Sequence, residues 1–343
     1  MNGFVETAPT TDAYWRSVIL FGKNSASYKF ALGRSLLEVA NRGETFVSLE
    51  ELAEPYARHL VEHLGRTDRQ GTTASSRFLD ACRQFAEGGI TKDQLIARAV
   101  KLGFANVLDS FHNVNQREIP VRFFIDERGT RSGINLTDEL LGLKDTFQHE
   151  NLDHEVEARW RLVETAWSLD VTPTLLVARY EPLGGEIYVE AGGARRHAVT
   201  SGRDALNGYQ KGRCFYCSSE ISVVAGNKEL CDVDHFFPHT LVRFLPGGRG
   251  NLDGVWNLVL SCRACNRGKE GKAARLPTIR YLERLHRRNE YLIWSHHPLR
   301  ETLISQTGRT EAERRSFLQG IEAFAAERLV SRWEPPDELR PIL

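Results

Sequence analysis

Residues Cys231 to Thr240 read CDVDHFFPHT and set His235 directly after an aspartate inside an otherwise apolar run. Apolar residues around Val233 and again from Val255 to Leu260 predict two short strands, separated by the glycine-rich stretch PGGRGNLDG. The segment after Cys265 is predicted to be a helix. The resulting order is strand, loop, strand, helix, and it places an imidazole beside a carboxylate at the first strand.

Two C-x-x-C pairs flank this stretch, and their four cysteines predict a metal site. They are Cys214, Cys217, Cys262 and Cys265. Thiols stay reduced in the cytosol and four thiolates match the tetrahedral coordination of zinc, so the pairs predict a structural Zn²⁺ ion. A redox-active pair or a set of buried thiols is the alternative. Cys82 and Cys231 are unpaired by pattern, and we expect Cys231 to pack in the first strand.

The chain has 343 residues, 41% of them hydrophobic, which is long enough for two or three cores. No uncharged run approaches the length of about 20 residues that spans a bilayer, and the start has no signal-peptide pattern. We therefore expect a cytoplasmic protein with no membrane partner. Between Gly193 and Glu290, 17 basic and 9 acidic residues give a net charge of +8 in a chain that is neutral overall. This segment favours a polyanion site, with a solvated charged surface as the alternative.

The predicted fold class is α+β, a mostly helical chain with a small core clamped by zinc. Helices are predicted over residues 12–115, two of them opened by capping boxes, Ser48 with Glu51 and Thr91 with Gln94. The division has four parts. They are a helical N-terminal domain at 1–115, a linking region of hairpins and helix at 116–192, the zinc-clamped core at 193–276 and C-terminal helices at 277–343.

The linking region is predicted from changes in the residue pattern. Pro120 to Leu136 reads as a hairpin, helices follow from Asp138 to Asp170, and LLVARYEPLGGEIYVEA reads as a second hairpin. In the C-terminal part the last helix is predicted from Thr310 to Trp333.

The core resembles the HNH endonuclease superfamily, whose fold is a β-β-α metal motif. The resemblance rests on D-H-x-x-P at Asp234, His235 and Pro238, on W-N-L at Trp256, Asn257 and Leu258, and on C-x-x-C-N-x-x-K at Cys262, Cys265, Asn266 and Lys269. It covers Arg203 to Lys272, and the paired C-x-x-C frame is common in that superfamily. In general architecture the chain is also similar to prokaryotic anti-phage and restriction-type members, which implies defence against foreign DNA.

The resemblance implies roles for individual residues. His235 would be the general base, because an imidazole is partly neutral near pH 7 and accepts a proton from water. Asp234 and Asn266 would bind Mg²⁺ (or Mn²⁺), which prefers hard oxygen ligands. Asn257 would hold the loop that carries His235 through hydrogen bonds. The third motif position is Asn266 and not histidine, so the site is an H-N-N variant.

Three basic residues are predicted to lie on the helix and to contact phosphates, namely Arg267, Lys269 and Lys272. Each taken singly is also compatible with a surface charge. His239 is a candidate for contacting the scissile phosphate, with an exposed structural role as the alternative. His197, with Arg195 and Arg196, is expected in a loop or strand. A solvated loop is the preferred interpretation there, and contact with backbone phosphates is the alternative. Asp232 is expected to face solvent.

Three functions remain open at this point. The first is a metal-dependent endonuclease that cuts or nicks DNA, and the second is the same chemistry on RNA. The third is a zinc-stabilised nucleic-acid-binding module without catalysis, which the joint presence of Asp234, His235 and Asn266 disfavours. Because HNH cores make few base-specific contacts, we also expect the N-terminal helical domain to dock a protein partner or a second copy of the chain.

Overall fold

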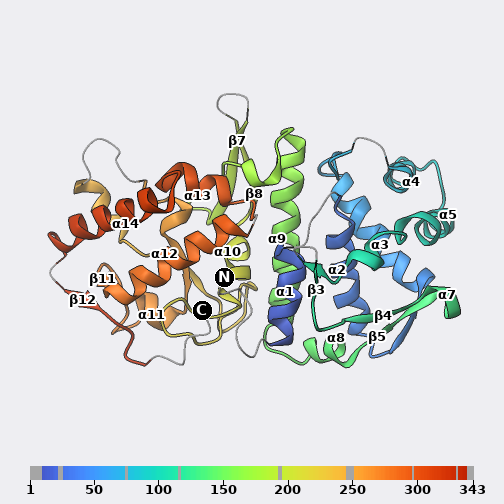
Figure 1. The fold of residues 1–343 in the computed structure, drawn as a ribbon, viewed down its shortest axis with the longest axis horizontal. Helices are drawn as coiled ribbons and strands as arrows, with labels where there is room; N and C mark the ends of the chain where they lie inside the picture. Colours follow the sequence, from blue (N-terminus) through green and yellow to red (C-terminus); the bar gives the residue numbers. More distant parts are fainter. Residues whose placement is uncertain are drawn as a thin grey trace. The chain divides into compact units, whose positions relative to one another are not determined.

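The computed structural model describes residues 10–21, 26–73, 76–114, 117–191, 195–244, 251–295, 297–329 and 331–337. The chain divides into two compact units, unit 1 from Met1 to Asp170 and unit 2 from Val171 to Leu343. Unit 1 takes the blue to green part of the colour bar in Figure 1, and unit 2 takes the rest. Both units combine helices with small sheets, in agreement with the predicted α+β class.

Unit 1 is mainly helical. Its helices are α1 Thr11–Phe21, α2 Tyr28–Ala40, α3 Leu49–Leu64, α4 Arg77–Ala86, α5 Lys92–Arg98 with the π-helical η1 Ala99–Gly103, α6 Val107–Ser110, α7 Arg128–Arg131, α8 Asp138–Leu143 and α9 His149–Ser168. Both predicted capping boxes are confirmed, since Ser48 and Thr91 each exchange hydrogen bonds with the residue three positions on. Fully buried aromatic side chains, among them Trp15, Phe30 and Trp160, fill the core between these helices.

A small antiparallel sheet completes unit 1. It has the order β1-β5-β4, with β1 Phe46–Ser48, β4 Phe124–Glu127 and β5 Gly133–Leu136, beside a separate pair of β2 Asn113–Val114 and β3 Arg117–Glu118. The pairing of β4 with β5 confirms the first predicted hairpin. Strand β5 also pairs with β1, and residues 117–170 of the predicted linking region lie in unit 1, while the rest of it, from Val171, lies in unit 2.

A charged cluster lies inside unit 1 around His63. Its Nδ1 atom is 2.7 Å from Oε2 of Glu164, and its Nε2 atom is 3.0 Å from Oε2 of Glu157. The imidazole also stacks on Trp160, with ring centroids 3.5 Å apart. Burial lowers the pKa of His63, but the two carboxylates outweigh it and the pKa is raised. His63 is therefore held as a buried cation between two anions.

Unit 2 includes residues 193–276, for which the sequence predicts a zinc-clamped core. Its elements are η2 Pro173–Leu175, β6 Arg179–Glu181, β7 Glu186–Ala191, β8 Arg195–Ser201, α10 Gly202–Gln210, β9 Asp232–His235, η3 His239–Phe244, η5 Val255–Asn257, β10 Leu258–Ser261, α11 Arg263–Arg267, β11 Leu276–Pro277, α12 Ile279–Trp294, α13 Arg300–Thr307, α14 Glu311–Ala326 and β12 Arg332–Trp333. Strands β6, β7 and β8 form an antiparallel sheet, so the second predicted hairpin is present and gains a third strand.

Strands β9 and β10 pair antiparallel, with His235 opposite Leu258 and Asp232 opposite Ser261. They are the two short strands predicted around the glycine-rich loop. The helix begins earlier than predicted, at Arg263, because Cys262 caps it by accepting a hydrogen bond from the backbone of Cys265. The helix is also short and ends at Arg267, so the lysines that follow do not share it.

The C-terminal end differs from its prediction. Helix α14 stops at Ala326, and the segment from Arg332 to Trp333 forms a parallel pair with β11. The side chain of Trp333 is buried there and packs on Tyr216. Among the described residues, no helix has both the length and the apolar character that crossing a membrane requires.

Candidate functional site

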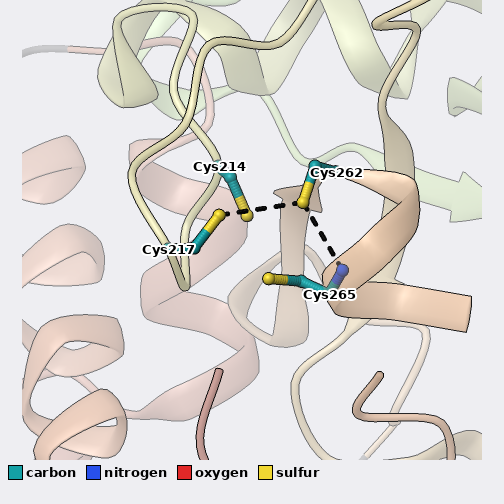
Figure 2. Close-up of side chains that lie close together, drawn as sticks. All are labelled: Cys214, Cys217, Cys262 and Cys265. Atoms are coloured by element: carbon teal, nitrogen blue, oxygen red, sulfur yellow. Dashed lines mark hydrogen bonds between the residues drawn. The ribbon is translucent and has the colours of Figure 1, made fainter. Parts of the chain in front are cut away.

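The four cysteines of the two C-x-x-C pairs come together in unit 2. Their Sγ atoms all lie within 4.8 Å of one another, and those of Cys217 and Cys262 are 3.7 Å apart. Figure 2 shows the side chains converging from two sides, Cys214 and Cys217 from a loop and Cys262 and Cys265 from the start of α11. This arrangement could hold one metal ion, as the sequence predicts.

The chemistry of this cluster suits zinc. Four sulfur ligands at mutual distances of this size match a tetrahedral Zn²⁺ site. A hydrogen bond from the Cys214 thiol lowers the pKa of Cys217 and brings that of Cys262 to about 6, so thiolates are favoured at these two positions. Burial raises the pKa of Cys214, and hydrogen bonds from the neighbouring thiols raise that of Cys265. The backbone N–H of Cys265 donates to Sγ of Cys262 at 3.4 Å, which stabilises negative charge on that sulfur.

His235 ends strand β9 and meets a carboxylate from the following loop. Its Nε2 atom lies 2.8 Å from Oδ1 of Asp253, and the ring is largely buried. Burial lowers the pKa of His235 and outweighs the attraction of Asp253 and Asp234. The imidazole is therefore neutral near pH 7, and Asp253 fixes the proton on Nε2. The lone pair is left on Nδ1, which can accept a proton.

Asn257 is fully buried below the loop that follows His235. Its Oδ1 atom accepts from the backbone N–H of Phe237 at 2.8 Å, and its Nδ2 atom donates to the carbonyl oxygens of Phe237 at 3.0 Å and Leu252 at 2.8 Å. The side chain thus joins the segment after His235 to the segment that carries Asp253. This is the geometry expected of the loop-holding asparagine.

Asp234 points away from His235, as alternation along a strand requires. It is buried, and its two carboxylate oxygens are both engaged. Oδ2 accepts from the hydroxyl of Tyr216 at 2.7 Å, and Oδ1 lies 3.3 Å from Nζ of Lys272. Burial raises the pKa of Asp234 against the opposing effect of Lys272. The ammonium of Lys272 occupies the position next to the carboxylate where a cation is predicted.

The described structure corrects the prediction for Lys272. Only 1% of its side chain is exposed, and it donates to the carbonyl oxygen of His235 at 2.9 Å. It therefore supports the site from inside and does not reach a phosphate. Lys269 is exposed, and Arg267 is exposed but paired with Asp232 at 3.0 Å.

Asn266 meets Asp232 and not Asp234. Its Nδ2 atom donates to Oδ2 of Asp232 at 3.1 Å. Because Arg267 binds the other oxygen of the same carboxylate, Asp232 is mostly covered and does not face solvent as predicted. The two predicted magnesium ligands, Asp234 and Asn266, are thus hydrogen-bonded to different partners.

Two residues of the site, Asp253 and Arg288, were not predicted from the sequence. Asp253 is the carboxylate of the NLDG loop, and its position four residues before Asn257 is the signal that could have found it. Arg288 of α12 donates to the carbonyl oxygens of Trp256 at 3.1 Å and Leu258 at 2.8 Å. Backbone acceptors have no letter in a sequence, so nothing in the pattern marks Arg288.

The other histidines and cysteines considered in the sequence differ in exposure and position. His239 is about half exposed and its Nε2 atom lies 3.3 Å from Oδ1 of Asp253. His197 is exposed on β8, in a strand and not in a loop. Cys231 is fully buried immediately before β9, and Cys82 is buried in α4.

Comparison with protein-family models, with curated proteins and with solved structures found no match to this chain.

Proposed function

We propose that the chain is an HNH-type endonuclease that hydrolyses phosphodiester bonds of DNA. The observation that carries the proposal is the pair of His235 and Asp253, in which a neutral imidazole keeps its acceptor nitrogen on Nδ1. The pair lies on a two-stranded hairpin beside a four-cysteine cluster, with Asn257 joining the two loops. This combination supports hydrolysis over binding alone, because a binding module has no need of an oriented base.

The chemistry assigned to this chain is proton removal from water. His235 takes a proton on Nδ1 while the water oxygen attacks phosphorus, and Asp253 stabilises the imidazolium that forms. General-base catalysis of this kind contributes about 10² to 10⁴-fold in rate. Asn257 keeps the base in position by fixing the backbone on both sides of it.

The two predicted metals differ in how well the residues fit them. The four thiols fit Zn²⁺, which would hold the loop of Cys214 and Cys217 against α11. Asp234 and Asn266 do not fit Mg²⁺ as a pair, since Lys272 and Tyr216 engage the first and Asp232 engages the second. A requirement for Mg²⁺ or Mn²⁺ stays a prediction for assay.

The charge of the chain supports a nucleic-acid substrate. The excess of basic residues between Gly193 and Glu290 surrounds the site in sequence. Arg263 and Lys269 are exposed in α11 and directly after it, and both are able to contact a phosphate backbone. Nothing among these contacts reads a base or a 2′-hydroxyl, so DNA is preferred on the resemblance to HNH enzymes.

The test is cleavage of supercoiled plasmid and of labelled single-stranded RNA, with Mg²⁺ or Mn²⁺ against EDTA. His235→Ala is compared with His197→Ala, a matched change of an exposed histidine in the same unit. We expect the wild type and His197→Ala to nick or linearise plasmid, and His235→Ala to be at least about 10²-fold slower. Cleavage of RNA alone would replace DNA as the substrate. If neither nucleic acid is cut with any of these metals, the proposal that the chain is a nuclease is contradicted.

We also propose that the N-terminal helical region docks a partner protein or a second copy of the chain. Residues 1–115 carry 13 basic and 13 acidic residues, so this region lacks the basic excess that favours DNA binding, which supports a protein partner. Light scattering of the purified protein and size-exclusion profiles in cell lysate test it. A monodisperse monomer in both would contradict it.

A further inference from the structure

The carboxylate of Asp253 is shared by two histidines. Its Oδ1 atom lies 2.8 Å from Nε2 of His235 and 3.3 Å from Nε2 of His239. The two rings are close neighbours, with centroids 5.4 Å apart and planes inclined by 60°. One anion therefore faces the same nitrogen of both imidazoles.

The two histidines differ in their contacts and in their exposure. Nε2 of His235 is hydrogen-bonded to Oδ1 of Asp253, which leaves Nδ1 of His235 as the acceptor. About half of the His239 side chain is exposed, so the second imidazole is open to solvent and to a substrate, whereas His235 is largely buried. The site thus places a buried base and an accessible imidazole beside the same carboxylate.

The chain fixes His239 on the side of the loop that follows the base. Phe237 is held by Asn257 through both its N–H and its carbonyl oxygen, and His239 follows two residues later at the start of η3. The carbonyl oxygen of Pro238 accepts from the backbone N–H of Leu241 at 3.0 Å, which closes the turn. The position of the second histidine is therefore set by the same contacts that set the first.

We propose that His239 is the general acid that protonates the leaving 3′ oxygen, an inference that rests on the proposed nuclease function. The water proton passes to Nδ1 of His235 as the new O–P bond forms. The bond between phosphorus and the 3′ oxygen breaks, and that oxygen takes the proton from Nδ1 of His239. The products are a 5′-phosphate and a 3′-hydroxyl. Solvent then removes one proton from His235 and returns one to His239.

The test exploits the leaving group. Cleavage of plasmid DNA releases a sugar alkoxide as the leaving group, which needs a proton. Hydrolysis of bis(p-nitrophenyl) phosphate releases a stabilised nitrophenolate, which does not. We expect His239→Gln to slow DNA cleavage about 10²-fold and to change turnover of the activated diester by less than about threefold. His235→Gln should slow both. Zinc content and thermal melting of each variant show that it is folded.

The alternatives give different patterns. Equal losses on both substrates would make His239 a positioning residue and overturn the acid, and no loss on DNA would make it a surface residue. If the wild type ignores the activated diester, the pH profile of DNA cleavage decides. A general acid produces a fall in rate at high pH that His239→Gln abolishes, and a fall that persists in the variant overturns the proposal. If the wild type cuts no nucleic acid, that result contradicts the proposed nuclease function itself, separately from the role of His239.

Discussion

Nε2 of His235 lies 2.8 Å from Oδ1 of Asp253, a residue 18 positions further along the chain. The carboxylate orients the ring and fixes its proton, so Asp253→Asn should disturb the base without emptying space. We expect DNA cleavage to fall about 10²-fold while the melting temperature stays close to that of the wild type. Plasmid nicking rates give the measurement, with the exposed Glu229→Gln as control. Wild-type rates in Asp253→Asn would remove the carboxylate from the mechanism.

Asn257 makes three buried hydrogen bonds, and Asn257→Ala leaves their backbone partners unsatisfied. We expect the free energy of unfolding of unit 2 to fall by about 2 to 4 kcal/mol and cleavage to fall with it. Urea unfolding gives the first quantity. Asn227→Ala, at a half-buried asparagine of the same unit whose Oδ1 accepts only one exposed backbone hydrogen bond, should change stability by less than about 1 kcal/mol. A similar small effect of Asn257→Ala would contradict the loop-holding role.

The four-cysteine cluster predicts one zinc per chain, measurable by atomic emission. Cys217→Ser should lose the metal and lower the melting temperature of unit 2, because metal binding and folding are coupled. Cys231→Ala is the matched control, since Cys231 is a buried cysteine of the same unit but is not one of the four ligands. Full zinc content in Cys217→Ser, or none in the wild type, would exclude the predicted site.

Arg288 binds the carbonyl oxygens of the segment that leads into β10. Arg288→Met keeps the length of the side chain but leaves these buried acceptors without a hydrogen-bond donor. We therefore expect a loss of about 2 to 4 kcal/mol in unfolding free energy. The exposed neighbour Arg287→Met should be nearly neutral. Chemical denaturation compares them, and equal stability of the two variants would show that the carbonyl contacts contribute little.

The cluster around His63 predicts a pH-dependent contribution to stability in unit 1. Its pKa is raised on folding, so the stabilisation is complete below the unfolded value of about 6.5 and is lost as the pH rises through the folded value. His63→Gln should therefore cost about 2 to 4 kcal/mol at pH 5.5 and clearly less at pH 9.5. In His59→Gln the pH dependence should have the opposite sign, because burial lowers the pKa of His59 to about 3 and only the unfolded imidazole binds a proton at pH 5.5. The cost of this variant should be smaller at pH 5.5 than at pH 9.5 by about 1 kcal/mol. A cost of His63→Gln that is the same at both pH values would contradict the buried cation.

Local patterns predicted much of the fold. The capping boxes at Ser48 and Thr91, both hairpins and the β9–β10 pair follow from the spacing of apolar, capping and turn residues over a few positions. The four cysteines meet because their pairing carries a chemical signature. Features that depend on distant packing escaped prediction, such as the joining of β5 to β1 and the burial of Trp333 against Tyr216.

The predicted site shows the same limit. The letters around Asp234 and Lys272 suggest a metal ligand and a phosphate contact, and only the packing reveals that the two side chains face each other inside the unit. Asp253 and Arg288 lie outside the three motifs, although the partners that they contact lie inside them. A motif therefore indicates which residues belong to a site, while their pairing depends on the rest of the unit.

Helix α12 lies outside the stretch from Arg203 to Lys272 that resembles HNH enzymes, but two of its arginines donate hydrogen bonds to that stretch. Arg284 donates to the carbonyl oxygen of Phe215, between the first two cysteines, and Arg288 to that of Leu258. Four residues apart, they lie on one side of the helix. The stretch that carries the motifs is consequently not expected to fold independently of helix α12. A fragment that ends before α12, or a fusion that grafts the stretch onto another chain, leaves its carbonyl oxygens without these donors, and the heritable module is the larger piece that includes the helix.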